Sequence, residues 1–275
     1  MTLFTVDPEK CKHDGLCAAV CPALLIEMED DQSLPRPIPE AEEICPNCGH
    51  CVAVCPNGAL TLTAMKPEDC LPLRQDLRLS PPQLEQFLRG RRSIRNYQDK
   101  PVPRELLHRV IELARYAPSG HNLQPVEWLV VEDISEARRL AGLTVDWLRQ
   151  VITQDPETAA RLHLDRVVRS WESGHDRIFR GAPHVIVAHA GQESKLATTS
   201  GVIALTYLEL AASALGLGTC WAGYFQRAAV EYPPLVKALG LPRDHILLGA
   251  LMIGYPKYKY ARAPLRNQPK ITWRS

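Results

Sequence analysis

The segment CPNCGHCVAVCP, residues 45–56, spaces its cysteines as C-x2-C-x2-C-x3-C and ends in proline. Thiolates at this spacing are typical ligands of an iron–sulfur cluster. The run consists of Cys45, Cys48, Cys51 and Cys55. It therefore predicts a small cluster-binding domain in the amino-terminal part of the chain.

A second run, CKHDGLCAAVCP at residues 11–22, repeats this spacing with one change. Cys11, Cys17 and Cys21 keep their places, whereas Asp14 stands where the second cysteine is expected. Each run ends in proline and is followed by a short apolar stretch, ALLIEM or GALTLT. This part of the chain is thus an internal repeat that predicts two metal clusters.

The distribution of cysteines favours metal ligation over disulfide bonds. The chain has nine cysteines, and seven of them lie between Cys11 and Cys55. The odd count, the tight spacing and the lack of a signal peptide all oppose a secreted disulfide framework. Zinc is a weaker alternative, because two paired runs ending in proline are not zinc-finger spacing. Cys70 and Cys220 are expected to be spare or packed thiols.

Over residues 1 to about 65, the two runs resemble those of bacterial ferredoxins with two 4Fe–4S clusters. In that family the fourth cysteine of each run binds the other cluster. The resemblance implies that one cluster is bound by Cys21, Cys45, Cys48 and Cys51. It implies that the other is bound by Cys11, Asp14, Cys17 and Cys55.

Asp14 is open to three interpretations. Its carboxylate can complete the coordination of the fourth iron, as in some ferredoxins. Because oxygen is a harder ligand than thiolate and holds iron less tightly, the site can instead hold a 3Fe–4S cluster or exchange that iron. Alternatively, Asp14 is only a turn residue before Gly15, since Asp-Gly is common in turns.

Charge and hydropathy exclude some classes of partner. Lys and Arg number 32 and Asp and Glu 31, so nothing indicates nucleic acid or an anionic membrane as the main partner. The first residues lack the charged and apolar regions of a signal peptide. The longest apolar run, residues 201–218, contains Glu209 and ends in glycines, which predicts a buried helix rather than a membrane span. We expect a soluble, cytoplasmic protein.

A proline-rich segment at residues 66–82 predicts an extended linker between a domain at 1–65 and a second domain at 83–275. In the second domain helical and strand patterns alternate, which predicts an α+β fold with a mainly antiparallel sheet. The expected helices lie at residues 83–90, 104–117, 135–173 and 201–215, and the expected strands at 127–133, 184–190 and 245–256.

Three separated segments carry the chemical signals of the second domain. RRSIR at residues 91–95 offers three guanidinium groups and a hydroxyl, which suit a phosphate, although such a run alone is more commonly a solvated basic turn. APSGHNLQPVEW at 117–128 places small residues and two amides before a strand, where they can ring a planar heterocycle. GLGTCWAGYF at 216–225 puts glycines where the backbone must approach something closely.

From about residue 83 to 265, the order and spacing of these segments resemble those of the nitroreductase flavoprotein family. The resemblance implies a layered α/β/α domain, an FMN cofactor and a homodimer with interlocked subunits. The backbone at 222–223 would face the N5 edge of the flavin. The implied FMN contacts are Arg91, Ser93, Arg95, Pro118, Ser119, Asn122, Gln124, Ala222, Gly223 and Arg262.

Within this resemblance, Arg91 and Ser93 hold the FMN phosphate with the help of Arg262. Arg95 lies near the N1/O2 side of the ring, where a positive charge stabilises the reduced flavin. The loop at 118–124 reaches FMN partly across the dimer interface.

Three positions depart from the family pattern. Val126 and Glu127 stand before Trp128, whereas many members have tryptophan directly after the proline. Tyr260 stands where a basic residue is common, so Arg262 is expected to carry more of the phosphate contact.

No side chain stands out as a catalytic acid or base. His121 and His175 are expected to be exposed or packed rather than catalytic. The tyrosines of segment 255–260 are expected to pack on the partner subunit, and the helical stretch 135–173 to form a specificity lid.

Together these features predict an oxidoreductase that passes electrons from a low-potential donor, such as ferredoxin, through the clusters to FMN. The acceptor is expected to be small and electron-poor, such as a nitroaromatic, a quinone or an activated alkene. Two alternatives remain: an NAD(P)H-dependent reductase with accessory clusters, and a non-catalytic redox carrier or sensor. The chain lacks a G-x-G-x-x-G motif, but this flavin family does not need one to use NAD(P)H.

Overall fold

The computed structural model describes residues 2–274 and separates the chain into two compact units. The first unit contains the residues up to Arg78 together with the short segment Gly120–Leu123, which we expected within the second domain. The second unit contains Leu79–Ser119 and the residues from Gln124 onward. Each unit has its own apolar core and is described separately below.

The first unit is built from two similar halves. In each half a glycine in the left-handed conformation, Gly15 (φ 67°) or Gly49 (φ 74°), starts a one-turn helix that carries a cysteine. A side chain is strained at such a φ, which explains glycine at both positions. The helices are α1 (Leu16–Val20), α2 (Ala41–Ile44) and α3 (His50–Val54), with 3-10 turns at Pro67–Asp69, Gln75–Leu77 and Gly120–Asn122.

Two small antiparallel ribbons close this unit. β1 pairs with β4, so that Phe4 lies opposite Leu62, and β2 pairs with β3. The strands are β1 (Phe4–Val6), β2 (Ile26–Glu27), β3 (Arg36–Pro37) and β4 (Leu60–Leu62). β2 and β4 come from the apolar stretches that follow the two cysteine runs, so both halves of the repeat contribute to one core.

The second unit contains a four-stranded sheet in the order β5-β6-β8-β7, and every neighbouring pair is antiparallel. The strands are β5 (Glu127–Val131), β6 (His184–Gly191), β7 (Gly218–Trp221) and β8 (His245–Gly254). This arrangement confirms the predicted α+β fold with a mainly antiparallel sheet.

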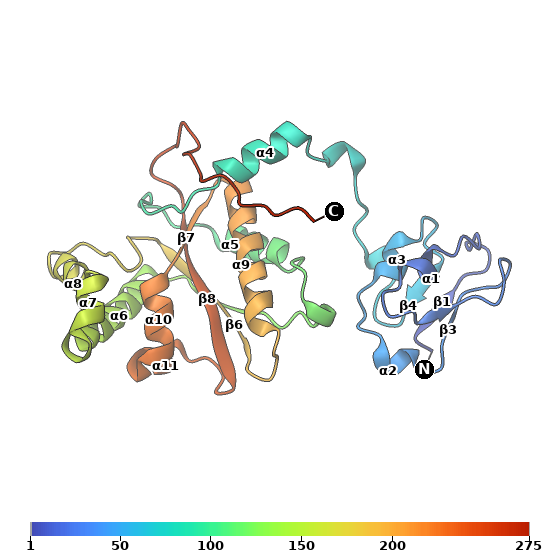
Figure 1. Cartoon of the computed structure of the whole chain (residues 1–275), viewed down its shortest axis with the longest axis horizontal. Coiled ribbons are helices and arrows are strands. Elements are labelled where there is room, and N and C mark those ends of the chain that lie inside the picture. The colour runs from blue at the N-terminus through green and yellow to red at the C-terminus, as the bar shows by residue number, and fades with distance from the viewer. Residues whose placement is uncertain (1, 275) are drawn as a thin grey trace. The chain divides into compact units, whose positions relative to one another are not determined.

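Helices cover both faces of this sheet, with α5 and α9 on one side and α6, α10 and α11 on the other (Figure 1). Residues of β6 alternate between two cores: Val185 and Val187 face one, and Ile186 and Ala188 face the other. A strand buried on both faces is expected to be largely apolar, and β6 is apolar apart from His184 and His189. The helices are α4 (Pro81–Gly90), α5 (Arg104–Ala114), α6 (Ile134–Gln154), α7 (Pro156–Arg161), α8 (Leu164–Glu172), α9 (Ala197–Ala214), α10 (Gly223–Glu231) and α11 (Pro233–Leu239).

The predicted apolar helix is α9, and it packs closely on β8. A Cβ placed on Gly201 would stand 2.6 Å from the Cβ of Leu248, so glycine permits this approach. Within residues 2–274, the structure has no helix that is both long and apolar enough to cross a membrane.

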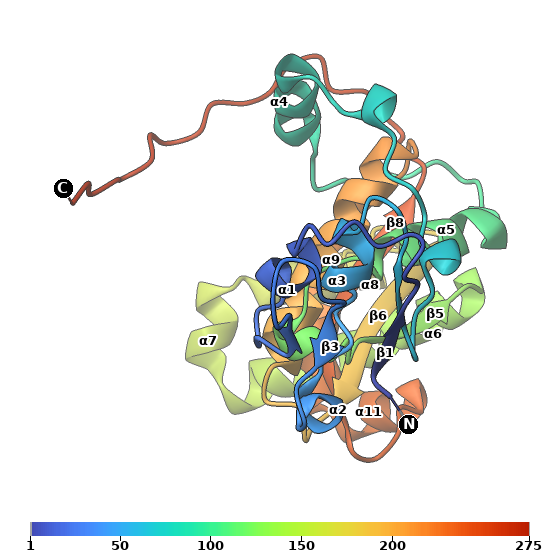
Figure 2. The same ribbon diagram turned by 90° about the vertical axis from the view of Figure 1, so that its right-hand side faces the viewer.

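The carboxy-terminal residues 261–274 have no regular structure and are exposed. Figure 2 shows them as an extended arm that leads away from the sheet and its helices. The arm carries apolar side chains in water, with Leu265 92% and Trp273 87% exposed.

Candidate functional site

The seven cysteines of the two runs line two separate cavities. The first, called here the Cys48 cavity, is lined by Cys21 together with Cys45, Cys48 and Cys51. The second, called the Asp14 cavity, is lined by Cys11, Asp14, Cys17 and Cys55. In each cavity, the last cysteine of one run thus joins three ligand positions of the other run.

The two crossover cysteines, Cys21 and Cys55, have the same local backbone. Cys21 ends α1 and Cys55 ends α3, and both have nearly the same extended conformation, with ψ of 110° and 111°. Each sulfur accepts a backbone N–H at 3.3 Å, from Leu25 or from Ala59. Hydrogen bonds of this kind to ligand sulfurs are one of the features that tune the potential of a bound cluster.

Burial raises the pKa of the two thiols inside the helices, Cys17 in α1 and Cys51 in α3. Desolvation raises the pKa of Cys51 to about 11 and also raises the pKa of Cys17. The free thiols therefore keep their protons at neutral pH. A cluster bound at these positions must displace those protons, which couples assembly of the cluster to pH.

Asp14 occupies the same place in its run as Cys48 does in the other. Its carboxylate borders the Asp14 cavity, while Oδ1 accepts the backbone N–H of Leu16 at 3.2 Å. This hydrogen bond is the one expected of a turn residue before Gly15. The second carboxylate oxygen has no such backbone partner among the described residues, so the same side chain has a free oxygen for a metal. Ligation by Asp14 stays a prediction.

We expect Asp14→Cys to make the cluster of the Asp14 cavity resistant to oxidation. In the parent protein, an iron held by oxygen should leave first on mild oxidation, giving the electron paramagnetic resonance signal of a 3Fe–4S cluster. The cysteine variant should lose that signal and shift the reduction potential of the cluster. If the signal, the potential and the lability are all unchanged, Asp14 is a turn residue and not a ligand.

In the second unit, a buried carboxylate positions the first arginine of RRSIR. Glu209 on α9 is 7% exposed, and its Oε1 lies 3.4 Å from the Nη1 of Arg91. The same carboxylate accepts hydrogen bonds from Thr219 Oγ1 at 3.2 Å and from Trp221 Nε1 at 3.1 Å. Arg91, α9 and β7 are thereby joined in one polar network.

The RRSIR segment runs beside β7. Ser93 forms a bridge with Thr219, whose carbonyl accepts the N–H of Ile94 at 2.8 Å. Arg92 has a buried Nε without a hydrogen-bond partner among the described residues, and its guanidinium lies over the ring of Tyr260. A buried donor without a partner is rare, and it marks a place where an acceptor is expected.

Arg95 borders a second-unit cavity, called here the Arg95 cavity. Gly223 at the start of α10 lines the same cavity, and beyond its chain neighbours and its own helix backbone no atom of the described residues lies within 4 Å of the place where its Cβ would stand. Three further arginines, Arg177, Arg180 and Arg227, also border the cavity. It is therefore an electropositive hollow at the end of β7. Its other walls include Trp147, Val151, Leu162, Leu164, Cys220, Trp221, Tyr224 and Met252.

The loop residues predicted to bind FMN lie elsewhere. Pro118, Ser119 and Gln124 line a different cavity, called here the Gln124 cavity, where Ser119 Oγ accepts the N–H of Gln124 at 3.0 Å. Asn122 belongs to the segment that clusters with the first unit. Within one chain the structure therefore does not bring the loop residues together with Arg91 and Arg95.

Of the remaining residues considered in the sequence, two are buried and two are exposed. Ala222 is buried, and its N–H donates to the carbonyl of Ala250 at 2.9 Å. Arg262 is exposed in the carboxy-terminal arm. Cys220 is buried and its pKa is raised by desolvation, which fits a packed thiol. His175 is exposed and lies near the hydroxyl of Ser173.

Sequence reasoning missed the network of Glu209 and the cationic wall of the Arg95 cavity. Glu209 had a visible signal, because it is the lone charge in the apolar run 201–218. Arg177 and Arg180 had none, because their role depends on how the segment after α8 folds back. The predicted lid is formed by α6, α7 and α8, which supply core residues as well as part of the cavity wall.

Comparisons with known proteins agree with this architecture. The nitroreductase family matches residues 88–255, and a 4Fe-4S dicluster domain matches residues 4–56. An NADH dehydrogenase of Thermus thermophilus is 35% identical over 198 residues, which are 67% of this chain and 92% of that protein. An FMN reductase (NAD(P)H) of Bacillus subtilis is 32% identical over 189 residues, which are 67% of this chain and 70% of that protein.

A solved structure shares the fold of the second unit. It is a nitroreductase with bound FMN from Desulfitobacterium hafniense, with a TM-score of 0.57 and 24% identity over 70% of this chain and 97% of that chain. The chain is therefore an oxidoreductase that belongs to the nitroreductase family and carries an amino-terminal 4Fe-4S dicluster domain.

Proposed function

We propose that the protein takes electrons from a low-potential donor such as ferredoxin and delivers them to a small, electron-poor organic substrate. The electrons would enter through two clusters in the first unit and leave from FMN in the second. The observation that carries this proposal is the presence, in one chain, of two cysteine-lined cavities and a nitroreductase domain with an arginine-lined cavity. Nitroaromatics, quinones and activated alkenes are the substrate classes that we consider.

The residues present fit both kinds of cofactor. Each cysteine-lined cavity offers four ligand positions, and backbone N–H groups point at two of the sulfurs. For FMN, donors for a phosphate are offered by the guanidinium of Arg91 and by the buried Nε of Arg92, which has no hydrogen-bond partner in the described part of the chain. The open space over Gly223 admits a flat ring close to the backbone at the start of α10.

When bound, the clusters carry electrons singly, and FMN accepts them one at a time and gives up two to an organic substrate. The chain's own residues hold and tune these groups. We assign the phosphate to Arg91 and Ser93, with Arg262 assisting. Arg95 supplies positive charge beside the ring, and the N–H groups at the start of α10 offer hydrogen bonds at its edge.

We further propose that a second copy of the chain completes the FMN site. The Arg95 cavity and the Gln124 cavity are separate within one chain, yet the residues expected at one FMN are divided between them. The exposed arm with Leu265 and Trp273 offers apolar surface for a partner. A homodimer would place Pro118, Ser119 and Gln124 of one subunit beside Arg91 and Arg95 of the other.

NAD(P)H is the second candidate donor. The relatives in Thermus thermophilus and Bacillus subtilis are described as an NADH dehydrogenase and an NAD(P)H-dependent FMN reductase. In that case the clusters would be accessory, exporting or storing electrons rather than supplying them.

Anaerobic reduction of the holoprotein by single donors separates these possibilities. We expect reduced ferredoxin to bleach the flavin and to support turnover of a nitroaromatic, whereas NADH and NADPH should bleach it slowly. Rapid bleaching by NADH or NADPH, with no reaction with ferredoxin, would establish the second candidate. Bleaching by any donor without turnover of nitroaromatics, quinones or alkenes would indicate a redox carrier or sensor.

A further inference from the structure

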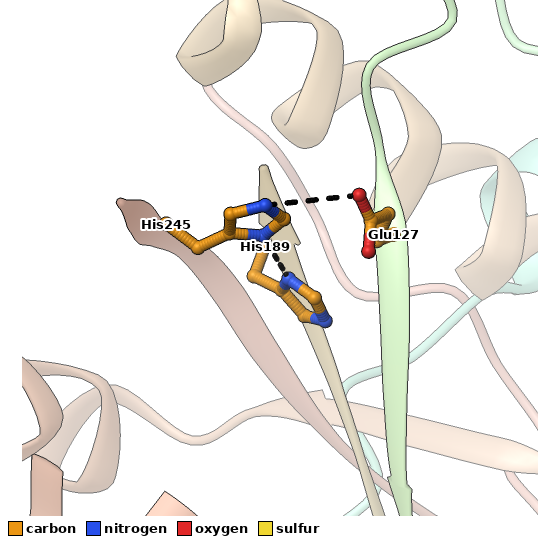
Figure 3. Close-up of side chains that lie close together, drawn as sticks. All are labelled: Glu127, His189 and His245. Carbon is orange, nitrogen blue, oxygen red and sulfur yellow. Dashed lines mark hydrogen bonds and ion pairs between the residues drawn. The ribbon is translucent and has the colours of Figure 1, made fainter. Parts of the chain in front are cut away.

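Three side chains outside the cavities described above meet on one face of the sheet. Glu127 lies on β5, His189 on β6 and His245 on β8, and they come together near one end of these strands (Figure 3). Glu127 and His189 are direct cross-strand partners, and His245 lies opposite Gly191. Because Gly191 is two residues from His189, the strand alternation projects all three side chains from the same face.

The polar atoms of this cluster are close enough to share one ion. Nδ1 of His189 lies 2.8 Å from Nδ1 of His245, and Nε2 of His245 lies 3.8 Å from Oε1 of Glu127. One ligand atom from each residue can be chosen so that all three lie within 4.8 Å of one another. Ligands around a tetrahedral zinc ion are about 3.3 Å apart, so small side-chain rotations bring these atoms to binding distance.

Burial leaves the cluster enclosed on one side and open on the other. His189 is 6% exposed, the His245 side chain is 11% exposed, and the Glu127 side chain is 61% exposed. A hydrated cation can therefore approach past the carboxylate. The carboxylate of Glu193 occupies the space that a Cβ on Gly191 would fill. Gly191 is the cross-strand partner of His245, so a second carboxylate lies close to this part of β6.

We propose that Glu127, His189 and His245 form a binding site for a divalent first-row transition metal, with Zn²⁺ as the best match. Two imidazole nitrogens and one carboxylate oxygen are the ligands that such ions prefer, and magnesium and calcium prefer oxygen alone. Three protein ligands leave a fourth position for water. The site joins three neighbouring strands and is distinct from the cysteine cavities and the Arg95 cavity.

The sequence contained part of this signal. Glu127 is one of the residues that separate the proline from Trp128, where many nitroreductases have none. His189 is one of two histidines in β6, whose other side chains are apolar. A buried histidine in an apolar strand needs a polar partner, and here the partner is a second histidine rather than a backbone carbonyl.

The test uses full-length holoprotein with its clusters and FMN in place, treated with a chelator and then given one equivalent of Zn²⁺. X-ray absorption at the zinc edge should show nitrogen and oxygen atoms at about 2.0–2.1 Å from the zinc, because Glu127, His189 and His245 offer no sulfur ligand. A sulfur shell at about 2.3 Å would place the zinc on cysteines and overturn the proposal.

Variants identify the ligands. We expect His245→Ala and Glu127→Gln each to weaken Zn²⁺ binding at least about tenfold in equilibrium dialysis. Even the replacement of a residue that only hydrogen-bonds to a metal ligand has an effect of about that size. Glu127 is exposed, so its variant should fold even if the loss of a histidine disturbs the sheet. The matched control is His108→Ala, which removes an exposed histidine four residues before Glu112 on α5. Equal Zn²⁺ affinity in the parent, His245→Ala and Glu127→Gln would overturn the assignment.

Discussion

Replacing Cys48 by alanine is expected to abolish turnover driven by a ferredoxin-type donor. Cys48 lines the Cys48 cavity with three other cysteines, and an iron that loses one of four thiolates is left with an open position. The cluster should then be lost or fail to assemble, and the proposed electron path would be cut. Donor-driven reduction of a nitroaromatic should fall to the background rate.

The same variant should keep the chemistry of the second unit. The two units have separate apolar cores, so loss of a cluster should leave the nitroreductase domain folded. When dithionite reduces the flavin directly, Cys48→Ala should still pass electrons to a nitroaromatic at the parent rate. Equal loss of both activities would mean that the cluster supports the fold of the whole chain.

Cys70→Ala is the matched control for this experiment. Cys70 lies outside both cysteine-lined cavities, and its thiol is within 3.4 Å of the carbonyl of Lys66. Its replacement should leave the iron content and both activities unchanged. A loss of iron in Cys70→Ala would show that general damage to the first unit, rather than a missing ligand, explains the effect of Cys48→Ala.

Arg91→Ala is expected to weaken FMN binding by about 10- to 100-fold. A hydrogen bond to a charged group contributes about 1.5–3 kcal/mol, and each 1.4 kcal/mol is a factor of ten in affinity. The effect should appear as FMN lost on gel filtration and as a raised Kd in flavin fluorescence titrations of the apoprotein. If Arg91→Ala keeps FMN as tightly as the parent, the phosphate assignment is wrong.

The partner of Arg91 makes a folding control necessary. Removing the guanidinium leaves the buried carboxylate of Glu209 with Thr219 and Trp221 as its remaining partners among residues 2–274. A buried charge without its counterion is destabilising, so the thermal midpoint of the apoprotein should also fall. Arg91→Lys keeps the charge but loses the two-pronged geometry, and should therefore weaken FMN binding with a smaller effect on the midpoint.

Arg89→Ala tests whether any nearby arginine would have the same effect. Arg89 is on α4, two residues away, and its exposed side chain forms an ion pair with Glu85. Exposed pairs of this kind contribute little to stability, so FMN affinity and the midpoint should both stay at the parent values. A shared loss of affinity would point to the overall charge of the segment instead of to Arg91.

Cysteine spacing alone was enough to predict that the first unit binds clusters. Ligand spacing such as that of Cys45, Cys48 and Cys51 is a local property, because a few residues of backbone decide which side chains can converge. The dicluster match confirms this prediction. The family and the antiparallel α+β fold of the second unit were likewise predictable, since they depend on the order of helix and strand patterns along the chain.

Contacts between residues far apart in the chain could not be predicted in this way. Arg91 and Glu209 are 118 residues apart, and their contact depends on how α9 packs beside β7. His189 and His245 are 56 residues apart, and a shift of one residue between β6 and β8 would turn one of them to the other face of the sheet. Strand register and helix packing are set by the whole core. A local sequence pattern is therefore not enough to predict which of these residues come into contact.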